Sequence, residues 1–230
     1  MAGKITRHIP NAVTCCNLLS GCVATAFALQ GDYRPALLFI VLGATFDFFD
    51  GLTARLLHVS SPVGKELDSL ADVVTFGVAP SAMVFSLLQT LTTNAVLPYA
   101  AFLLAAFSAL RLARFNLDER QTTSFIGLPT PANALFWSSL TCTVTPGFPY
   151  LLVLLLGLIL LFSWLLVSPI PMFSLKFKNA RWKDNRVRYV FLLGCCIPLN
   201  FLGIGGIAVI IGWYIILSLI TQRREPKPTA

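Results

Sequence analysis

The sequence predicts an all-α integral membrane protein, a single transmembrane domain over residues 1–230 with about eight transmembrane helices. Three observations support this class. The chain is 56% hydrophobic and only 12% charged, whereas soluble domains are about 25% charged. Several apolar runs reach the roughly 20 residues that a helix needs to cross the hydrocarbon core. These runs are continuous rather than alternating, which argues against a membrane β-barrel.

Clusters of turn-forming residues separate the apolar runs and set the predicted boundaries. Gly31-Asp32 follows the first run, residues 60–62 follow the second, and residues 92–94 follow the third. Residues 146–149, which contain two prolines and a glycine, separate the fifth run from the sixth. The predicted membrane segments lie near residues 11–30, 33–57, 67–90, 95–116, 128–145, 149–171, 188–202 and 204–221.

The first segment also has features of a secretory signal peptide. Lys4 and Arg7 precede an apolar stretch that ends in the small-residue pattern Ala26-Phe27-Ala28. The segment carries polar residues that are unusual in such a peptide, namely Asn11, Thr14 and Asn17. We therefore expect a retained membrane helix, with cleavage as the alternative.

The positions of the basic residues predict the orientation of the chain. With the N-terminus in the cytoplasm, every one of the 17 lysines and arginines except Arg34 falls on the cytoplasmic side, as the positive-inside rule requires. The basic stretch near residues 173–188 is expected to form a cytoplasmic loop beside anionic lipid. The net charge of +7 therefore indicates orientation in a lipid bilayer, and no nucleic-acid partner is expected.

Four aspartates form the strongest candidate site. Four of the chain's 10 acidic residues are aspartates crowded into 26 positions within predicted membrane segments, where ionisable side chains are costly and usually functional. Asp47 and Asp50 share one helix face by their i, i+3 spacing, and Asp68 and Asp72 share another by their i, i+4 spacing. A turn near residues 59–61 would pair the two helices as an antiparallel hairpin. All four carboxylates would then lie at one depth, near the cytoplasmic ends of the helices.

Carboxylates this close together repel one another, so two divalent cations would balance the four charges. Ligands that are all oxygen suit Mg²⁺ or Mn²⁺ better than zinc. Two such ions about 4 Å apart can hold a pyrophosphate and stabilise its leaving oxygen. The alternative for the aspartates alone is a cation pathway, as in a cation-coupled transporter.

The residues around the aspartates favour the phosphate ligand. Gly51, Ala54 and Gly64 are small enough to leave room for a ligand beside the backbone. Arg55 follows one turn after Gly51, and its planar guanidinium can contact phosphate oxygens.

Residues 47–72 follow the pattern D-x-x-D-G-x-x-A-R-x(8)-G-x-x-x-D-x-x-x-D. By this signature the chain is identified as a member of the CDP-alcohol phosphatidyltransferases. The resemblance implies a CDP-alcohol phosphotransferase core in which the aspartates bind metal and Asp72 is also the catalytic base. The metal ligands that it implies are Asp47, Asp50, Asp68 and Asp72. The residues that it implies for CDP binding are Asp50, Gly51, Ala54, Arg55, Gly64 and Asp68.

Other stretches resemble the phosphatidylserine synthases within this family. They are residues 9–14 with Asn17 and Leu18, residues 72–80, residues 110–116 and residues 125–131. This resemblance implies transfer of a phosphatidyl group from CDP-diacylglycerol to L-serine in the cell inner membrane, with the active site facing the cytoplasm. Glycerol 3-phosphate, inositol and choline are the alternative acceptors. A homodimer is one alternative for the oligomeric state.

The acceptor site is predicted from residues near the end of the fourth segment. Arg111 and Arg114 lie one helical turn apart, and guanidinium groups bind carboxylates such as that of serine bidentately. Anchoring of the helix end at lipid phosphates is the alternative for these arginines. Asn116 either binds the amino group of serine or caps the helix. We expect direct displacement, because no Ser, Cys or His is placed beside a base to act as an enzyme nucleophile.

Overall fold

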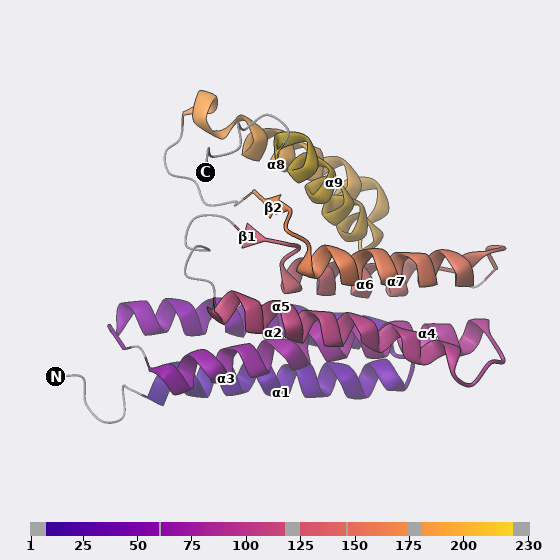
Figure 1. Cartoon of the computed structure of the whole chain (residues 1–230), viewed down its shortest axis with the longest axis horizontal. Coiled ribbons are helices and arrows are strands. Elements are labelled where there is room, and N and C mark those ends of the chain that lie inside the picture. Colours follow the sequence, from indigo (N-terminus) through magenta and orange to yellow (C-terminus); the bar gives the residue numbers. More distant parts are fainter. Residues whose placement is uncertain (1–7, 60, 118–124, 146, 174–180, 223–230) are drawn as a thin grey trace.

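A computed structural model describes residues 8–59, 61–117, 125–145, 147–173 and 181–222 of the chain. Its helices stack in three tiers, with α1–α5 in the first, α6 and α7 in the second, and α8 and α9 in the third (Figure 1). The elements of the first tier are α1 (Ile9–Leu29), α2 (Tyr33–Leu56), α3 (Pro62–Asp72), η2 (Val73–Val78), α4 (Ala79–Leu91), η3 (Leu97–Phe102) and α5 (Leu103–Leu117). The remaining helices are α6 (Thr130–Thr143), α7 (Leu151–Val167), α8 (Trp182–Leu202) and α9 (Gly205–Gln222).

The predicted fold class is confirmed, because every predicted membrane segment coincides with helix. Within the described residues, four helical spans are long and apolar enough to cross a membrane: Ile9–Leu29, Tyr33–Leu56, Pro62–Leu91 and Leu97–Leu117. Two further apolar helices are shorter, at Leu151–Val167 and Gly205–Thr221. The chain is therefore a multi-pass membrane protein.

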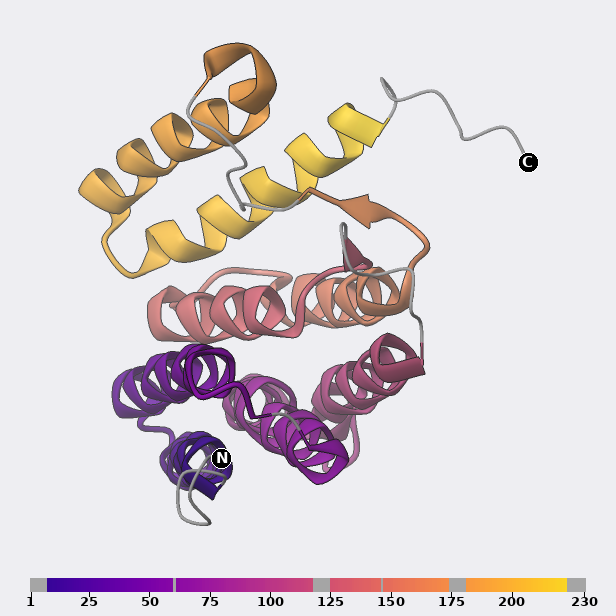
Figure 2. The ribbon, with the colours of Figure 1, turned by 90° about the vertical axis from the view of Figure 1, so that its left-hand side faces the viewer.

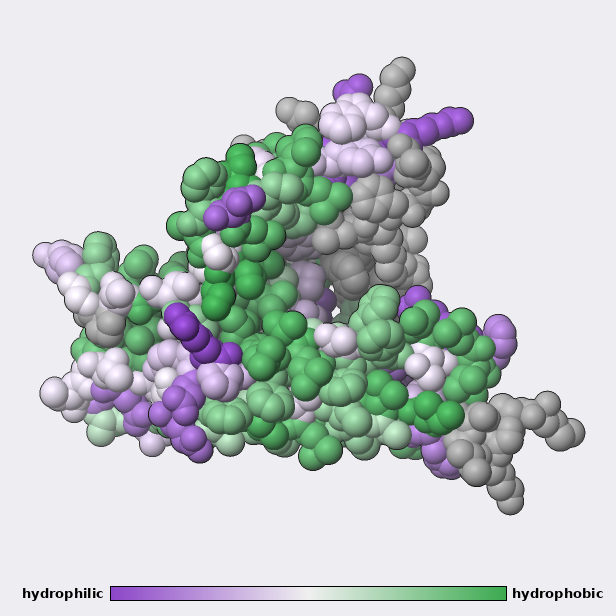
Figure 3. Space-filling model, turned by 180° about the vertical axis from the view of Figure 1, so that it is seen from behind, coloured by the Kyte–Doolittle hydropathy of each residue, from purple (hydrophilic) through white to green (hydrophobic). Residues whose placement is uncertain are grey.

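The surface of the molecule supports this conclusion. Figure 3 shows a broad apolar region over the middle of one face, with polar residues gathered toward its ends. Large apolar side chains are exposed on several helices, and Leu19, Phe48 and Leu160 are 63%, 67% and 63% exposed. Apolar surface of this extent is unusual on a soluble monomer. In a bilayer the same side chains would face the acyl chains of lipids.

The third predicted segment begins earlier than expected, at Pro62 rather than near residue 67. Ser61 is the N-cap of α3, and its hydroxyl oxygen accepts a hydrogen bond of 2.9 Å from the backbone N–H of Gly64. Proline at the first position of a helix is favourable because its missing N–H is not needed there. The predicted turn near residues 59–61 falls between the end of α2 at Leu56 and the start of α3 at Pro62, and residue 60 lies outside the described residues.

The helix that carries Asp72 changes its winding directly after that residue. The π-helix η2 joins α3 to α4, and π-helical turns are rare and frequent at functional sites. Within η2, the hydroxyl of Thr75 donates a hydrogen bond of 3.0 Å to the carbonyl oxygen of Asn17 on α1. On α2, a Cβ at Gly43 would lie only 2.5 Å from Cγ2 of Thr75. The close packing of α1, α2 and η2 therefore fixes the chain one turn beyond Asp72.

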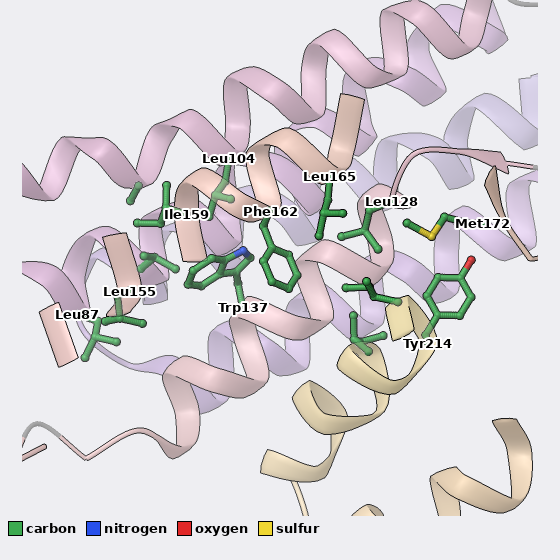
Figure 4. Packing of buried hydrophobic residues seen from close by; sticks show 14 of the residues in the cluster. Leu87, Leu104, Leu128, Trp137, Leu155, Ile159, Phe162, Leu165, Met172 and Tyr214 are labelled. Atoms are coloured by element: carbon green, nitrogen blue, oxygen red, sulfur yellow. The ribbon is translucent and has the colours of Figure 1, made fainter. Parts of the chain in front are cut away.

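The largest apolar core lies between the tiers and holds the second tier against the first. Trp137 on α6 is fully buried and meets Phe162 of α7 edge to face, with ring centroids 5.6 Å apart. Phe136 stacks on the same phenylalanine at 4.1 Å. Figure 4 shows Leu104 of α5 and Tyr214 of α9 contributing to this cluster. The core thereby fixes the position of α5, the helix that carries the predicted acceptor residues.

The predicted cytoplasmic loop near residues 173–188 is partly wrong as secondary structure. Helix α8 begins at Trp182, so residues 182–188 are helical. The indole of Trp182 stacks on Tyr189 two turns later, with ring centroids 5.0 Å apart and planes at 14°, which stabilises the start of the helix. Residues 174–180 lie outside the described residues.

Seen from one end, the helices of the first tier run nearly along the line of view, whereas α8 and α9 cross it as a separate hairpin (Figure 2). A short antiparallel pair of strands, β1 (Phe125–Ile126) and β2 (Pro171–Met172), lies at the same end of the second tier as the C-terminus of α7. The backbone N–H of Gly127 donates to the carbonyl oxygen of Ile170 at 2.9 Å, which continues this pairing.

Candidate active site

Three of the four aspartates meet between α2 and α3. Asp47, Asp50 and Asp68 each offer a carboxylate oxygen, and these oxygens all lie within 4.8 Å of one another. Asp50 is buried, and the other two are half-buried. α2 and α3 run in opposite directions, as predicted, but α1 packs against both of them, so the predicted hairpin is completed by a third helix (Figure 1).

Asp72 lies at the end of α3 and is 9% exposed. It interacts electrostatically with both Asp47 and Asp68, so it belongs to the same cluster. Its Oδ1 atom accepts a hydrogen bond of 3.2 Å from Nδ2 of Asn17, a fully buried residue of α1. One oxygen of Asp72 is therefore held by the first helix of the protein.

Asp50 is held by the same helix. The hydroxyl of Thr14 lies 2.7 Å from Oδ2 of Asp50 and donates to it, and it also lies 3.0 Å from the carbonyl oxygen of Pro10. Sequence reasoning missed this role of α1. The available signal was the spacing of Asn11, Thr14 and Asn17, which repeats every three residues and so puts three polar side chains on one face of an apolar helix.

The cluster fits a hard divalent cation. All of its ligand atoms are carboxylate oxygens, which magnesium and manganese prefer over softer donors. Oδ1 of Asp68 is buried without a hydrogen-bond partner among the described residues. A buried carboxylate oxygen that lacks a donor is costly unless a cation binds it.

A pocket of about 200 Å³ opens beside the cluster. Its lining comes from α1, α2, α3 and the turn between the last two, and comprises Pro10, Asn11, Thr14, Asp50, Gly51, Ala54, Val59, Ser61, Gly64, Lys65 and Asp68. A Cβ at Gly51 would meet nothing within 4 Å, so that side of the pocket is open. A Cβ at Gly64 would lie 3.0 Å from both Oδ1 of Asn11 and Oγ of Ser61, and would narrow the pocket.

Most of the residues predicted for CDP binding therefore line one pocket, with one exception. Arg55 follows Ala54 at the end of α2 and is exposed. It is not among the described residues that line the pocket. Lys65, which the sequence reasoning did not single out, lines the pocket instead. The ammonium group of Lys65 also donates a hydrogen bond of 3.0 Å to the carbonyl oxygen of Asn116.

The predicted acceptor residues lie on α5 in three different environments. Arg111 is 7% exposed and interacts electrostatically with Asp72. Arg114 is exposed, and its Nη1 donates a hydrogen bond of 3.3 Å to the carbonyl oxygen of Val167. The amide of Asn116 donates to the hydroxyl of Ser69 on α3 at 2.8 Å. The two arginines, which the sequence reasoning treated as a pair, thus differ in burial and in partners.

The fold and the cluster define a known class of membrane enzyme. The family model of CDP-alcohol phosphatidyltransferase matches residues 7–170, which include the aspartates, the pocket and both arginines. The chain therefore belongs to the CDP-alcohol phosphatidyltransferase family, as its signature predicted. The members of this family transfer a phosphate-containing group from a CDP-alcohol to an acceptor alcohol, so the protein is a phosphotransferase.

Several curated relatives share one name within this family. The CDP-diacylglycerol–serine O-phosphatidyltransferase of Bacillus subtilis is 39% identical over 141 residues, which cover 61% of this chain and 78% of that protein. The Helicobacter pylori protein of that name is 32% identical over 219 residues, or 92% of this chain and 89% of the relative. The Saccharomyces cerevisiae protein is 40% identical over 140 residues, and the match covers 54% of this chain and 50% of that relative.

Proposed function

We propose that the protein transfers the phosphatidyl group of CDP-diacylglycerol to L-serine and so forms phosphatidylserine and CMP. The observation that carries this proposal is the cluster of Asp47, Asp50 and Asp68 beside an open pocket. Asp72 is held by the hydrogen bond from Asn17. The acceptor is inferred from the relatives, since those of Bacillus subtilis, Helicobacter pylori and yeast are all named for serine.

Two divalent cations, Mg²⁺ or Mn²⁺, are proposed as cofactors held by the four aspartates. Bound there, they would neutralise the carboxylates and the negative charge of the CDP pyrophosphate. Thr14 and Asn17 support this role, because each fixes one carboxylate from behind and leaves its other oxygen available. Residues that orient metal ligands in this way commonly affect metal affinity.

The CDP part of the donor is proposed to occupy the pocket between α1, α2 and α3. Gly51, Ala54 and Gly64 give it space, while Asp50 and Asp68 stand at the boundary between pocket and cluster. Arg55 is exposed at the end of α2, so we assign it to the outer phosphate side of the ligand rather than to the base. The acyl chains of the donor would stay in the surrounding lipid.

The chemical step is proposed to be a single direct displacement. Asp72 takes the proton of the serine hydroxyl, and that oxygen forms a new bond to the phosphorus that bears the diacylglycerol. The bond from this phosphorus to the CMP oxygen breaks, and CMP leaves with the electron pair. Asn17 would orient Asp72 for this transfer through the hydrogen bond to Oδ1.

Arg111 is the proposed ligand of the serine carboxylate. It is buried, it interacts electrostatically with Asp72, and its positive charge complements a carboxylate. Arg114 is the weaker candidate, because its guanidinium is exposed and already bonded to the carbonyl oxygen of Val167. Asn116 joins α5 to α3 through Ser69, so we assign it to holding the two helices together rather than to the amino group of serine.

The protein is proposed to lie in the cell inner membrane with its site facing the cytoplasm, where serine and CDP-linked substrates occur. The distribution of lysine and arginine supports this orientation. A homodimer stays a prediction. The cation-coupled transporter, the alternative from another class, does not account for the family membership or for the pocket beside the aspartates.

The direct test is transfer of radiolabelled serine into chloroform-extractable lipid by membranes that contain the protein. Incorporation should depend on added CDP-diacylglycerol and should release CMP in equal amount. Parallel reactions with labelled glycerol 3-phosphate, inositol and choline would identify another acceptor. Incorporation of one of these in place of serine would reassign the substrate without changing the reaction.

A further inference from the structure

Lys65 is the only residue with a positive charge among the described residues that line the pocket beside the aspartates. The same lining includes two carboxylates, those of Asp50 and Asp68. Lys65 precedes Asp68 by three residues on α3, so it lies about 4.5 Å farther from Asp72 along the helix axis than Asp68 does. Lys65 is therefore the cation of the pocket on the side away from the proposed base.

The ammonium group of Lys65 has a defined position even though the residue is exposed. Its Nζ donates a hydrogen bond of 3.0 Å to the carbonyl oxygen of Asn116 on α5. Asn116 is held in turn, because its side-chain amide donates to the hydroxyl of Ser69 at 2.8 Å. Lys65 and Ser69 are four residues apart on α3 and so lie on one face of that helix. Both bonds therefore join this face of α3 to a single residue of α5.

The bond to Asn116 leaves the ammonium group with further donors. An ammonium group has three N–H donors and no acceptor, and the carbonyl oxygen of Asn116 takes one of them. A positive group in the pocket lining with two remaining donors suits an anionic oxygen as its ligand. The bond to α5 also restricts a flexible side chain in advance, which lowers the entropy lost when a ligand binds.

We propose that Lys65 binds the phosphate next to cytidine in the donor, the phosphate that leaves as part of CMP. This inference rests on the proposed function, in which the pocket holds the CDP part of the donor. The phosphate that bears the diacylglycerol must lie near Asp72, which is proposed to deprotonate the attacking hydroxyl. The other phosphate then lies farther from Asp72, on the side of Lys65. As the bond to the CMP oxygen breaks, this phosphate gains negative charge, which a fixed cation stabilises.

The test measures the Kd of CMP for the purified full-length protein in detergent with Mg²⁺, by isothermal titration calorimetry. Lys65→Met keeps an unbranched side chain and removes the charge. The Kd of CMP should rise about threefold to tenfold, less than for a buried charged group because Lys65 is exposed. Lys65→Arg keeps the charge and should bind CMP within about twofold of the parent protein. Thermal unfolding checks that each variant is folded.

Ser69→Ala is the matched control for the connection between α3 and α5. It removes the other bond to Asn116, and Ser69 is not among the described residues that line the pocket. The Kd of CMP for this variant should stay within about twofold of the parent value. An equal rise in Ser69→Ala and Lys65→Met would overturn the proposal, because Lys65 would then act only by holding two helices together.

Cytidine, which lacks the phosphate, separates a phosphate contact from a contact with the base or the sugar. Lys65→Met should leave the Kd of cytidine within about twofold of the parent value. Unchanged CMP binding in the folded Lys65→Met variant, or an equal loss for cytidine and CMP, would overturn the assignment of Lys65 to the phosphate. A parent protein that binds no CMP would instead contradict the proposed CDP pocket, so the two failures are distinguishable.

Discussion

The hydrogen bond from Asn17 to Asp72 permits a quantitative prediction. Asn17→Ala removes the Nδ2 donor, which lies 3.2 Å from Oδ1 of the proposed base. Hydrogen bonds to charged groups contribute about 1.5–3 kcal/mol, and this length is at the long end of the usual range. We therefore expect a loss near the lower limit, about 1.5–2 kcal/mol. Because each 1.36 kcal/mol changes a rate tenfold, kcat should fall about 10-fold to 30-fold.

The assay is incorporation of labelled serine at saturating serine and CDP-diacylglycerol, so that kcat is measured rather than binding. Ser20→Ala is the matched control on the same helix, since the Ser20 hydroxyl donates to the backbone carbonyl of Cys16 and not to an aspartate. That variant should keep kcat within about twofold, as expected for a site with no shared partner.

Refutation would take a simple form. Thermal unfolding would first check that the Asn17→Ala enzyme is folded. If the folded variant keeps at least half of the parent kcat, Asp72 needs no orientation by α1. An equal loss in Ser20→Ala would assign the effect to helix packing instead of to the hydrogen bond.

Three other predictions address the metal, the base and the acceptor. Chelation with EDTA should abolish serine transfer, and Mn²⁺ or Mg²⁺ should restore it; turnover that survives exhaustive chelation would exclude the metal-assisted mechanism. Asp72→Asn should lower kcat at least about a hundredfold, as for loss of a general base, while CDP-diacylglycerol still binds, and near-normal kcat would reassign the base. Arg111→Ala should raise the serine KM about tenfold to a hundredfold. Arg114→Ala should raise the serine KM less than about threefold, because the Arg114 guanidinium is exposed. Equal effects of the two variants would contradict the assignment of the serine carboxylate to Arg111.

Much of the fold and the centre of the site followed from the sequence because both depend on local spacing. The apolar runs set the helices, and the i, i+3 and i, i+4 spacing of the aspartates set the two faces that meet. The length of the turn between α2 and α3 then determined their register. The carboxylate oxygens of Asp47, Asp50 and Asp68 meet as this spacing predicted.

The parts that were missed depend on contacts between distant segments. The bond between Asn17 and Asp72 joins residues 55 positions apart, and the sequence shows only that a polar side chain lies in an apolar helix. Arg111 and Arg114 have the same residue type and lie one turn apart, yet the fold buries only Arg111.

The configuration at phosphorus tests the central claim most directly, because it follows the transferred group itself. The substrate is CDP-diacylglycerol in which sulfur replaces one oxygen on the phosphorus that bears the diacylglycerol, so that this phosphorus has a defined configuration. The protein would receive this substrate together with serine and Mn²⁺. A single displacement by the serine hydroxyl predicts phosphatidylserine of inverted configuration. Retained configuration would indicate two displacements and a covalent enzyme intermediate, and would contradict the direct attack that we assign to serine and Asp72.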